Sequence, residues 1–157
     1  MKNITATLLL MLLVASATAQ LKIGDTLPVI TLKDPLGIAV TNSVFRGKTV
    51  LVDFWASWCG PCRKANKTLV PFYKKYRSHN FEAISISVDT DKTKWLQAIA
   101  KDKLVHQQLI DPNGFDAASA MLFGVEALPT TYLFDTAGKL VAIDPTEKQI
   151  INQLKKK

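Results

Sequence analysis

The feature that most constrains the fold is an apolar segment that runs directly into a helical one. Residues 49–55 (Thr-Val-Leu-Val-Asp-Phe-Trp) are nearly all apolar or β-branched, which is typical of a strand buried on both faces. From Cys59 onward the apolar period becomes that of a helix, with a proline, Pro71, inside it that we expect to cause a kink. The apolar stripe of this helix consists of Ala65, Leu69, Phe72, Tyr73 and Tyr76. Because both faces of such a strand must be covered by other elements, the chain is predicted to belong to the α/β class.

The other predicted elements complete a mixed sheet. Strands are predicted at residues 29–32, 38–40, 81–88, 130–134 and 139–143, and helices at residues 92–101 and 115–123. The last helix should begin with Asp144 as the capping side chain, Pro145 at the first helical position and Glu147 at the third. The strands on either side of the Cys59 helix should be parallel, with a right-handed crossover, and the final two strands antiparallel. We therefore expect one domain with helices on both faces of its sheet.

Composition excludes several other classes of protein. The chain has 157 residues, of which 48% are hydrophobic, so it is neither disordered nor fibrous. Two cysteines are too few for a small domain held together by disulfides. The net charge of +7 comes without the interleaving of aromatic and basic residues that nucleic-acid binding needs. The basic run at residues 155–157 is interpreted as a solvated helix end.

The amino-terminal segment resembles a cleaved secretory signal. A positive start at Lys2 precedes an apolar run at residues 4–15, and Ala17-Thr18-Ala19 has the small-x-small pattern cleaved by signal peptidase. A membrane anchor is the alternative, but a spanning helix needs roughly 20 apolar residues. We expect residues 1–19 to be removed, leaving an exported domain at residues 20–157, periplasmic or extracellular, with no stable membrane insertion. Disulfides can persist in those compartments.

Cys59 and Cys62 are the residues that indicate chemistry. Cys59 is predicted at a helix amino terminus, where free N–H groups and the helix dipole favour a thiolate and lower the thiol pKa. Cys62 lies one helical turn further in and should be less exposed, and Pro61 suits the first turn of the helix. Attack of Cys59 on a substrate disulfide would give a mixed disulfide, which Cys62 resolves by displacing Cys59.

Two structural alternatives compete with a redox role for this cysteine pair. Half of a zinc site would need further ligands, and His79 and His106 lack ligand-like spacing, so no metal is predicted. An inert structural disulfide is the other alternative, but so short a loop adds little stability. A redox-active Cys59–Cys62 disulfide is therefore favoured.

Two more positions are candidates for the site. Asp53 interrupts the central apolar strand, so its side chain should be buried beneath the cysteines with a raised pKa, able to exchange a proton with Cys62. A carboxylate hydrogen-bonded for fold specificity is the alternative. Pro129 begins a strand, where a cis Leu128–Pro129 bond would let the Leu128 backbone pair with a substrate peptide. A trans proline that simply opens the strand is equally compatible with the sequence.

These segments together resemble a known family. Residues 50–62 are similar to the active-site segment of thioredoxins, and residues 124–130 to their cis-proline segment. The leading segment from Gly24 to Lys48 resembles the amino-terminal hairpin of exported TlpA-like thiol–disulfide oxidoreductases. The resemblance extends over nearly all of residues 22–154 and implies a thioredoxin-like three-layer fold with an amino-terminal β-hairpin extension. It implies Cys59 as nucleophile, Cys62 as resolving thiol and Asp53 as buried acid/base, and it also implies that Pro129 is the cis proline.

The chain departs from this family at three positions. Ala65 stands where many TlpA-like proteins carry a glutamate, and Lys67 where many relatives have a kinking proline. Ser85 stands where thioredoxins carry a lysine near the buried aspartate. Asp53 would then work without these helpers, which should change the thiol pKa values and the redox potential.

The sequence therefore predicts an exported protein-disulfide oxidoreductase, acting as a reductase. We expect Trp58, Gly60, Pro61, Leu128 and Pro129 to contact substrate. Partners should be protein thiols and disulfides and an upstream electron donor, with a membrane-embedded protein as one option. No cofactor, no nucleic acid and a monomeric state are expected. The alternatives are an oxidase or isomerase of exported proteins, and a redox-inert binding or assembly module.

Overall fold

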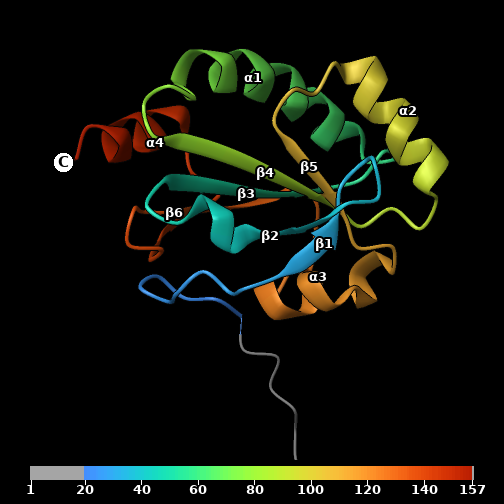
Figure 1. Cartoon of the computed structure of the whole chain (residues 1–157), viewed down its shortest axis with the longest axis horizontal. Coiled ribbons are helices and arrows are strands. Elements are labelled where there is room, and N and C mark those ends of the chain that lie inside the picture. Colours follow the sequence, from blue (N-terminus) through green and yellow to red (C-terminus); the bar gives the residue numbers. More distant parts are fainter. Residues whose placement is uncertain (1–19, 157) are drawn as a thin grey trace, which may run out of the picture.

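A computed structural model describes residues 20–156 (Figure 1). The predicted signal peptide, residues 1–19, lies outside the described residues. Seven strands form a single mixed sheet in the order β2-β1-β5-β4-β3-β6-β7. Helices α1 (Gly60–Tyr76), α2 (Lys92–Asp102) and α4 (Glu147–Leu154) lie on one side of the sheet in Figure 1, and α3 (Ala118–Phe123) lies on the opposite side. This is the predicted three-layer, thioredoxin-like α/β fold.

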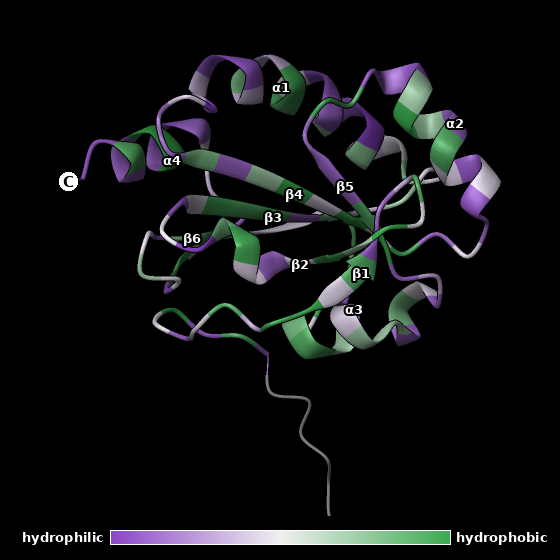
Figure 2. Ribbon diagram, in the orientation of Figure 1, coloured by the Kyte–Doolittle hydropathy of each residue, from purple (hydrophilic) through white to green (hydrophobic). Residues whose placement is uncertain are grey.

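The central strand has the predicted burial. All seven residues of β3 (Thr49–Trp55) are buried, and Figure 2 shows this strand coloured largely as hydrophobic. β3 pairs in parallel with β4 (Phe81–Ser87) and antiparallel with β6 (Thr130–Phe134). Strand β7 (Leu140–Ile143) adds an antiparallel partner to β6 at one edge. The predicted parallel pair around α1 and the predicted terminal hairpin are both confirmed.

Alternate residues of β3 belong to two different cores. Leu51 packs with Phe72 of α1 and Ile150 of α4. Val50, Val52 and Phe54 belong to the larger cluster on the other face. Burial of these two faces holds helices on both sides of the sheet, because each layer removes apolar surface from water.

The sequence prediction missed one strand. β5 (Gln107–Ile110) pairs in parallel with β4 and antiparallel with β1 (Thr31–Lys33). It begins with two glutamines, so it shows neither an apolar run nor a regular alternation. Gln108 is nevertheless buried, because this short strand lies between two others. β5 is the strand that joins the amino-terminal hairpin to the main sheet.

The boundaries of two other elements differ from the prediction. The hairpin strands are β1 and β2 (Ala39–Thr41), one to two residues later than expected at the start of each. Between these strands the Asp34 carboxylate accepts hydrogen bonds from the backbone N–H groups of Leu36 and Ile38. The predicted 115–123 helix is a 3₁₀ turn (Gly114–Asp116) followed by α3. Helix α1 runs through Pro71 as one element.

The predicted start of the last helix was wrong. Thr146, and not Asp144, is the N-cap of α4, and its hydroxyl accepts from the backbone N–H of Gln149 in a capping box. Asp144 instead has φ of 47°, and its carboxylate accepts from the Thr131 backbone N–H at 2.8 Å. Asp144 therefore links the segment before α4 to β6. Thr146, the next residue with a side chain that can cap a helix, is the N-cap instead.

We expect Thr146→Ala to lower the free energy of unfolding by about 1 kcal/mol, since it removes an N-cap hydrogen bond. Thr136→Ala, at an exposed turn position, is the matched control and should change stability little. Equilibrium unfolding in guanidinium chloride measures both variants. Equal effects of the two substitutions would contradict the assignment of the cap.

Candidate active site

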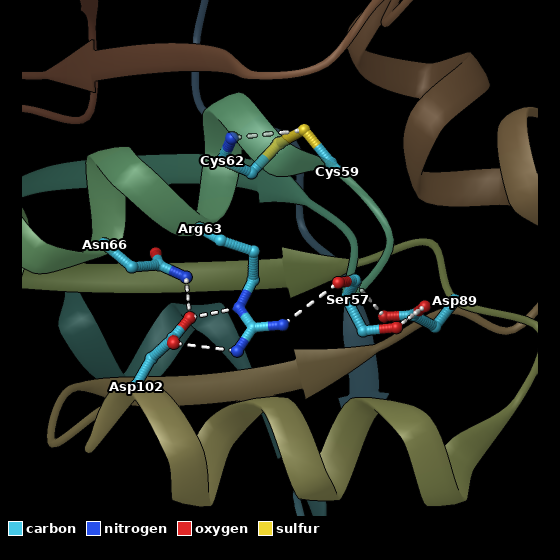
Figure 3. A network of polar contacts seen from close by, with 7 residues as sticks. All are labelled: Ser57, Cys59, Cys62, Arg63, Asn66, Asp89 and Asp102. Carbon is cyan, nitrogen blue, oxygen red and sulfur yellow. Dashed lines mark hydrogen bonds and ion pairs between the residues drawn. A yellow bond between two sulfur atoms is a disulfide. The ribbon is translucent and has the colours of Figure 1, made fainter.

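Cys59 and Cys62 form a disulfide at the start of α1. The Cα atoms are 5.3 Å apart, and Cys59 is the N-cap, with its Sγ accepting from the Cys62 backbone N–H at 3.2 Å (Figure 3). Cys62 is 1% exposed and Cys59 5%. Cys62 is the less exposed of the two, as predicted, but the expectation that Cys59 lies at the surface is wrong for this disulfide-bonded state, since both cysteines are buried.

Three of the residues predicted to contact substrate lie beside the cysteines in the chain and are exposed. Trp58 is 61% exposed, and Gly60 and Pro61 are also exposed. The Leu128–Pro129 bond is cis, which decides between the two possibilities that the sequence left open. Leu128 packs against the core cluster that contains both cysteines.

Asp53 lies in the middle of β3, where its neighbours in register are Ser85 on β4 and Thr131 on β6. Its side chain is buried, and desolvation raises the carboxyl pKa to about 6, with the nearby charge of Asp144 adding to the increase. A hydrogen bond from the Ser85 hydroxyl to Asp53 Oδ2, at 2.8 Å, acts in the opposite direction. The buried, perturbed carboxyl group that the sequence predicted is present.

Asp53 borders a hollow of about 460 Å³ between α1, β6 and the start of α4. Pro129 and Asp144 line the same hollow. The structure thus brings the buried carboxyl group and the cis proline to one cavity.

Sequence reasoning missed the polar contacts of Ser85. The Ser85 Oγ lies 2.8 Å from His106 Nε2 as well as 2.8 Å from Asp53. In the sequence, His106 stands out only as a possible metal ligand without suitable spacing. No local pattern could reveal its contact with Ser85, because the two residues are 21 positions apart and meet only when β4 and β5 pair.

A second group of polar side chains holds the loop before Cys59. The Asp89 carboxylate accepts from the Ser57 backbone N–H and hydroxyl, at 2.8 and 2.7 Å. Arg63, next to Cys62, donates to the Ser57 carbonyl oxygen at 3.1 Å and forms an ion pair with Asp102 at the end of α2 (Figure 3). The Arg63 guanidinium lowers the pKa of Asp102. These contacts fix the residues on both sides of the disulfide relative to α2 and β4.

Residues 20–156 hold neither a metal-binding cluster nor a membrane-spanning helix. This part of the chain contains no group of three or more His, Cys, Asp or Glu side chains that could hold a metal ion. None of its helices is long and apolar enough to cross a membrane.

Comparisons with known proteins agree on one family. A family model described as Redoxin matches residues 22–154. Thiol-disulfide oxidoreductase ResA of Bacillus cereus (strain ATCC 10987 / NRS 248) is 31% identical over 147 residues, which cover 90% of this chain and 82% of that protein.

Solved structures show the same relationship. A thiol-disulfide oxidoreductase from Bacteroides fragilis NCTC 9343 is 34% identical, with a TM-score of 0.76 over 83% of this chain and 98% of that one. The thioredoxin domain of a thiol-disulfide oxidoreductase from Bacteroides vulgatus is 30% identical, with a TM-score of 0.77 over 87% of this chain and 98% of that one.

Burial of Asp53 leads to a pH-dependent stability. Its pKa is about 6 in the folded state against 3.8 for the ordinary carboxyl group, so the folded state binds more protons between these values. Stability therefore falls as pH rises from about 4 to about 6, by about 3 kcal/mol in total. Asp53→Asn, which keeps an acceptor for Ser85, should make the protein more stable by up to this amount at pH 8.

Guanidinium unfolding at pH 8 and below pH 4 tests this. The stabilisation by Asp53→Asn should be large at pH 8 and should nearly vanish in acid, where Asp53 is protonated in both states. A difference that is the same at both pH values would show that Asp53 is not a buried carboxylate of raised pKa.

Proposed function

The chain belongs to the Redoxin family and is a thiol–disulfide oxidoreductase, and from this premise we propose that it is an exported reductase of protein disulfides. The resemblance to thioredoxin-type oxidoreductases seen in the sequence is confirmed by the family match and by the relatives. The direction of electron flow, the roles of individual residues and the export of the chain belong to the proposal.

The asymmetry of the cysteine pair is the single observation that carries the proposed mechanism. Cys59 is the N-cap of α1 beside the exposed Trp58, Gly60 and Pro61, whereas Cys62 lies one turn inside the helix; both cysteines are buried, Cys62 at 1% and Cys59 at 5% exposed. A thiolate at the N-cap is stabilised by the helix dipole and by the Cys62 N–H that already points at its sulfur. Cys59 is therefore the attacking sulfur, and Cys62 is protected from substrate.

The first step forms a mixed disulfide. In the reduced protein the Cys59 thiolate attacks one sulfur of a partner disulfide, the partner S–S bond breaks, and its second sulfur leaves as a thiolate that takes a proton from water. Trp58 and the Leu128–Pro129 segment would lie against the partner peptide, and the Leu128 backbone would hydrogen-bond it in extended form.

The second step releases the reduced partner. Cys62 gives its proton to the Asp53 carboxylate, and the resulting thiolate attacks Cys59 Sγ. The Cys59–Cys62 disulfide forms as the bond to the partner sulfur breaks, and the partner leaves as a thiolate that is then protonated. Two electrons have passed from the cysteine pair to the partner. With its pKa of about 6, Asp53 is largely ionised at neutral pH and remains a usable base.

The rest of the proposal follows from the sequence. The Gly60-Pro61 pair between the cysteines is the pair found in reducing thioredoxins, which favours the reductase role. Residues 1–19 have the pattern of a cleaved signal, so the mature domain would act in the periplasm or outside the cell, as a monomer. An upstream donor must return two electrons to the Cys59–Cys62 disulfide after each cycle, and no further cofactor is needed because the sulfur atoms carry the electrons.

Cys62→Ser should trap the partner, because the mixed disulfide on Cys59 can no longer be resolved. We expect disulfide-linked adducts with exported proteins on a non-reducing gel, and the loss of those adducts on treatment with dithiothreitol. Cys59→Ser and the double variant are the matched controls and should form none. Insulin reduction should be abolished in all three variants. Absence of adducts with Cys62→Ser would contradict the exchange mechanism, and partner binding that survives Cys59→Ser would favour a redox-inert docking module.

The reductase role predicts a low redox potential. Potentials of disulfide oxidoreductases run from about −270 mV for thioredoxin to about −120 mV for the strong oxidant DsbA. Equilibration with glutathione buffers, followed by mass measurement of the alkylated thiols, should place the Cys59–Cys62 pair near the reducing end. A value near the oxidising end would replace the reductase role with that of an oxidase or isomerase.

A further inference from the structure

Asp53 is the first member of a chain of three buried side chains. The Ser85 hydroxyl donates to Asp53 Oδ2 at 2.8 Å, and its oxygen lies 2.8 Å from His106 Nε2. A serine hydroxyl has one hydrogen and two lone pairs. Because that hydrogen is directed at the carboxylate, the hydrogen between Ser85 and His106 must belong to Nε2. The order of donation is therefore His106 to Ser85 to Asp53.

The surroundings of His106 offer no partner that competes with Ser85. The residue is 5% exposed, and its Nδ1 has no hydrogen-bond partner among the described residues. The facing groups are the Tyr73 ring of α1, at 5.7 Å between centroids, and Glu82 of β4. Glu82 is already bound by the Tyr73 hydroxyl and by Lys48. Desolvation lowers the His106 pKa to about 4, so the ring is neutral at physiological pH, and the donation from Ser85 to Asp53 places its one proton on Nε2.

The groups facing Asp53 offer little else to stabilise its charge. The segment before α4 contributes Asp144 to the hollow and the first residue of α4 contributes Glu147, both acids, and β6 contributes Thr131. Helix α1 contributes uncharged side chains: Ala65, Asn66, Thr68, Leu69 and Phe72. Among the effects on the Asp53 pKa, the hydrogen bond from Ser85 is the one that lowers it.

We propose that His106 is a positioning residue for thiol–disulfide exchange: its Nε2–H holds and polarises the Ser85 hydroxyl toward Asp53, and so keeps Asp53 in the carboxylate form that accepts the Cys62 proton. This inference rests on the proposed role of Asp53 as base. Donation from His106 makes the Ser85 hydroxyl a stronger donor, since hydrogen bonds in a chain polarise one another in a low-dielectric interior. Without it, the hydroxyl is free to turn away from the carboxylate.

The decisive variants are His106→Leu and His106→Gln. Leucine removes the donor without placing a new polar group in the core, whereas the glutamine amide can donate to Ser85. We expect His106→Leu to raise the pKa of Asp53 by roughly one unit, and His106→Gln to restore most of the shift. Below the Asp53 pKa, the rate at which Cys62 resolves a preformed mixed disulfide should fall about tenfold in His106→Leu, since one pH unit is a factor of ten in carboxylate.

Two measurements follow these changes. ¹³C NMR of the Asp53 carboxyl carbon gives its pKa, and single-turnover release of a glutathione adduct on Cys59 gives the pH profile of the resolving step. Ser85→Ala, a small change at a fully buried position, should shift both in the same direction as His106→Leu. An unshifted Asp53 pKa in His106→Leu would overturn the proposal, even if Ser85→Ala shifts it, because Ser85 would then act on Asp53 without His106.

An Asp53→Asn background separates this inference from the proposed function. If Asp53 is the base, Asp53→Asn flattens the pH profile of resolution, and adding His106→Leu then changes it no further. If Asp53→Asn leaves the profile intact, the proposed role of Asp53 fails. If Asp53→Asn flattens the pH profile of resolution, but His106→Leu as a single substitution changes neither the Asp53 pKa nor the resolution rate, only the proposed role of His106 fails.

The unmodified protein provides a test that needs no variant. ¹⁵N NMR of the His106 ring should show the neutral Nε2–H tautomer at pH 7. An Nδ1–H tautomer would make Nε2 an acceptor, reverse the order of donation and overturn the proposal.

Discussion

Burial of β3 on both faces is the constraint on which the rest of the structure depends. Every residue of this strand is buried, so the chain that leaves it must return over the sheet as α1, in a right-handed crossover to the parallel strand β4. The turn between β3 and α1 therefore falls at the carboxyl edge of the sheet, where the helix amino terminus is exposed. Cys59 occupies that position and Cys62 lies one turn inside it. The same burial removes Asp53 from water and raises its pKa to about 6.

Buried polar groups near the site need hydrogen-bond or ion-pair partners, and these partners differ among the three carboxylates. Asp89 is bound by backbone and hydroxyl donors of Ser57 and by Ser87. Asp102 is paired with Arg63, which lowers its pKa. Asp53 has only the neutral Ser85 hydroxyl, itself in contact with His106, among the described residues. The Asp89 and Asp102 contacts thus support the active-site loop, whereas the Asp53 carboxyl group, with its pKa raised to about 6, lies close to its point of protonation. That difference suits it to exchange a proton.

The elements predicted well are those whose signal is local and strong. The apolar run of β3, the helical stripe of α1 and the last two strands were all located within a residue or two. β5 was missed because its two glutamines interrupt the apolar pattern expected of a buried strand. The strand is buried only because neighbouring strands flank it in the sheet. The start of α4 was misplaced because Asp144, a good capping residue by type, is engaged by Thr131 on another strand. In each case a contact between distant segments overrode the local preference.

By itself, the sequence determined that the chain folds as an α/β domain around one strand and that the Cys59–Cys62 pair heads a helix beside a buried Asp53. These features depend on apolar periodicity and on motif spacing, and both can be read directly from the order of the residues. Only the tertiary structure decided that Leu128–Pro129 is cis, that Arg63 reaches Asp102, and that Ser85 and His106 stand behind Asp53. These side-chain contacts join residues 21 to 39 positions apart, so they exist only once folding has packed α1 against α2 and brought the strands into register.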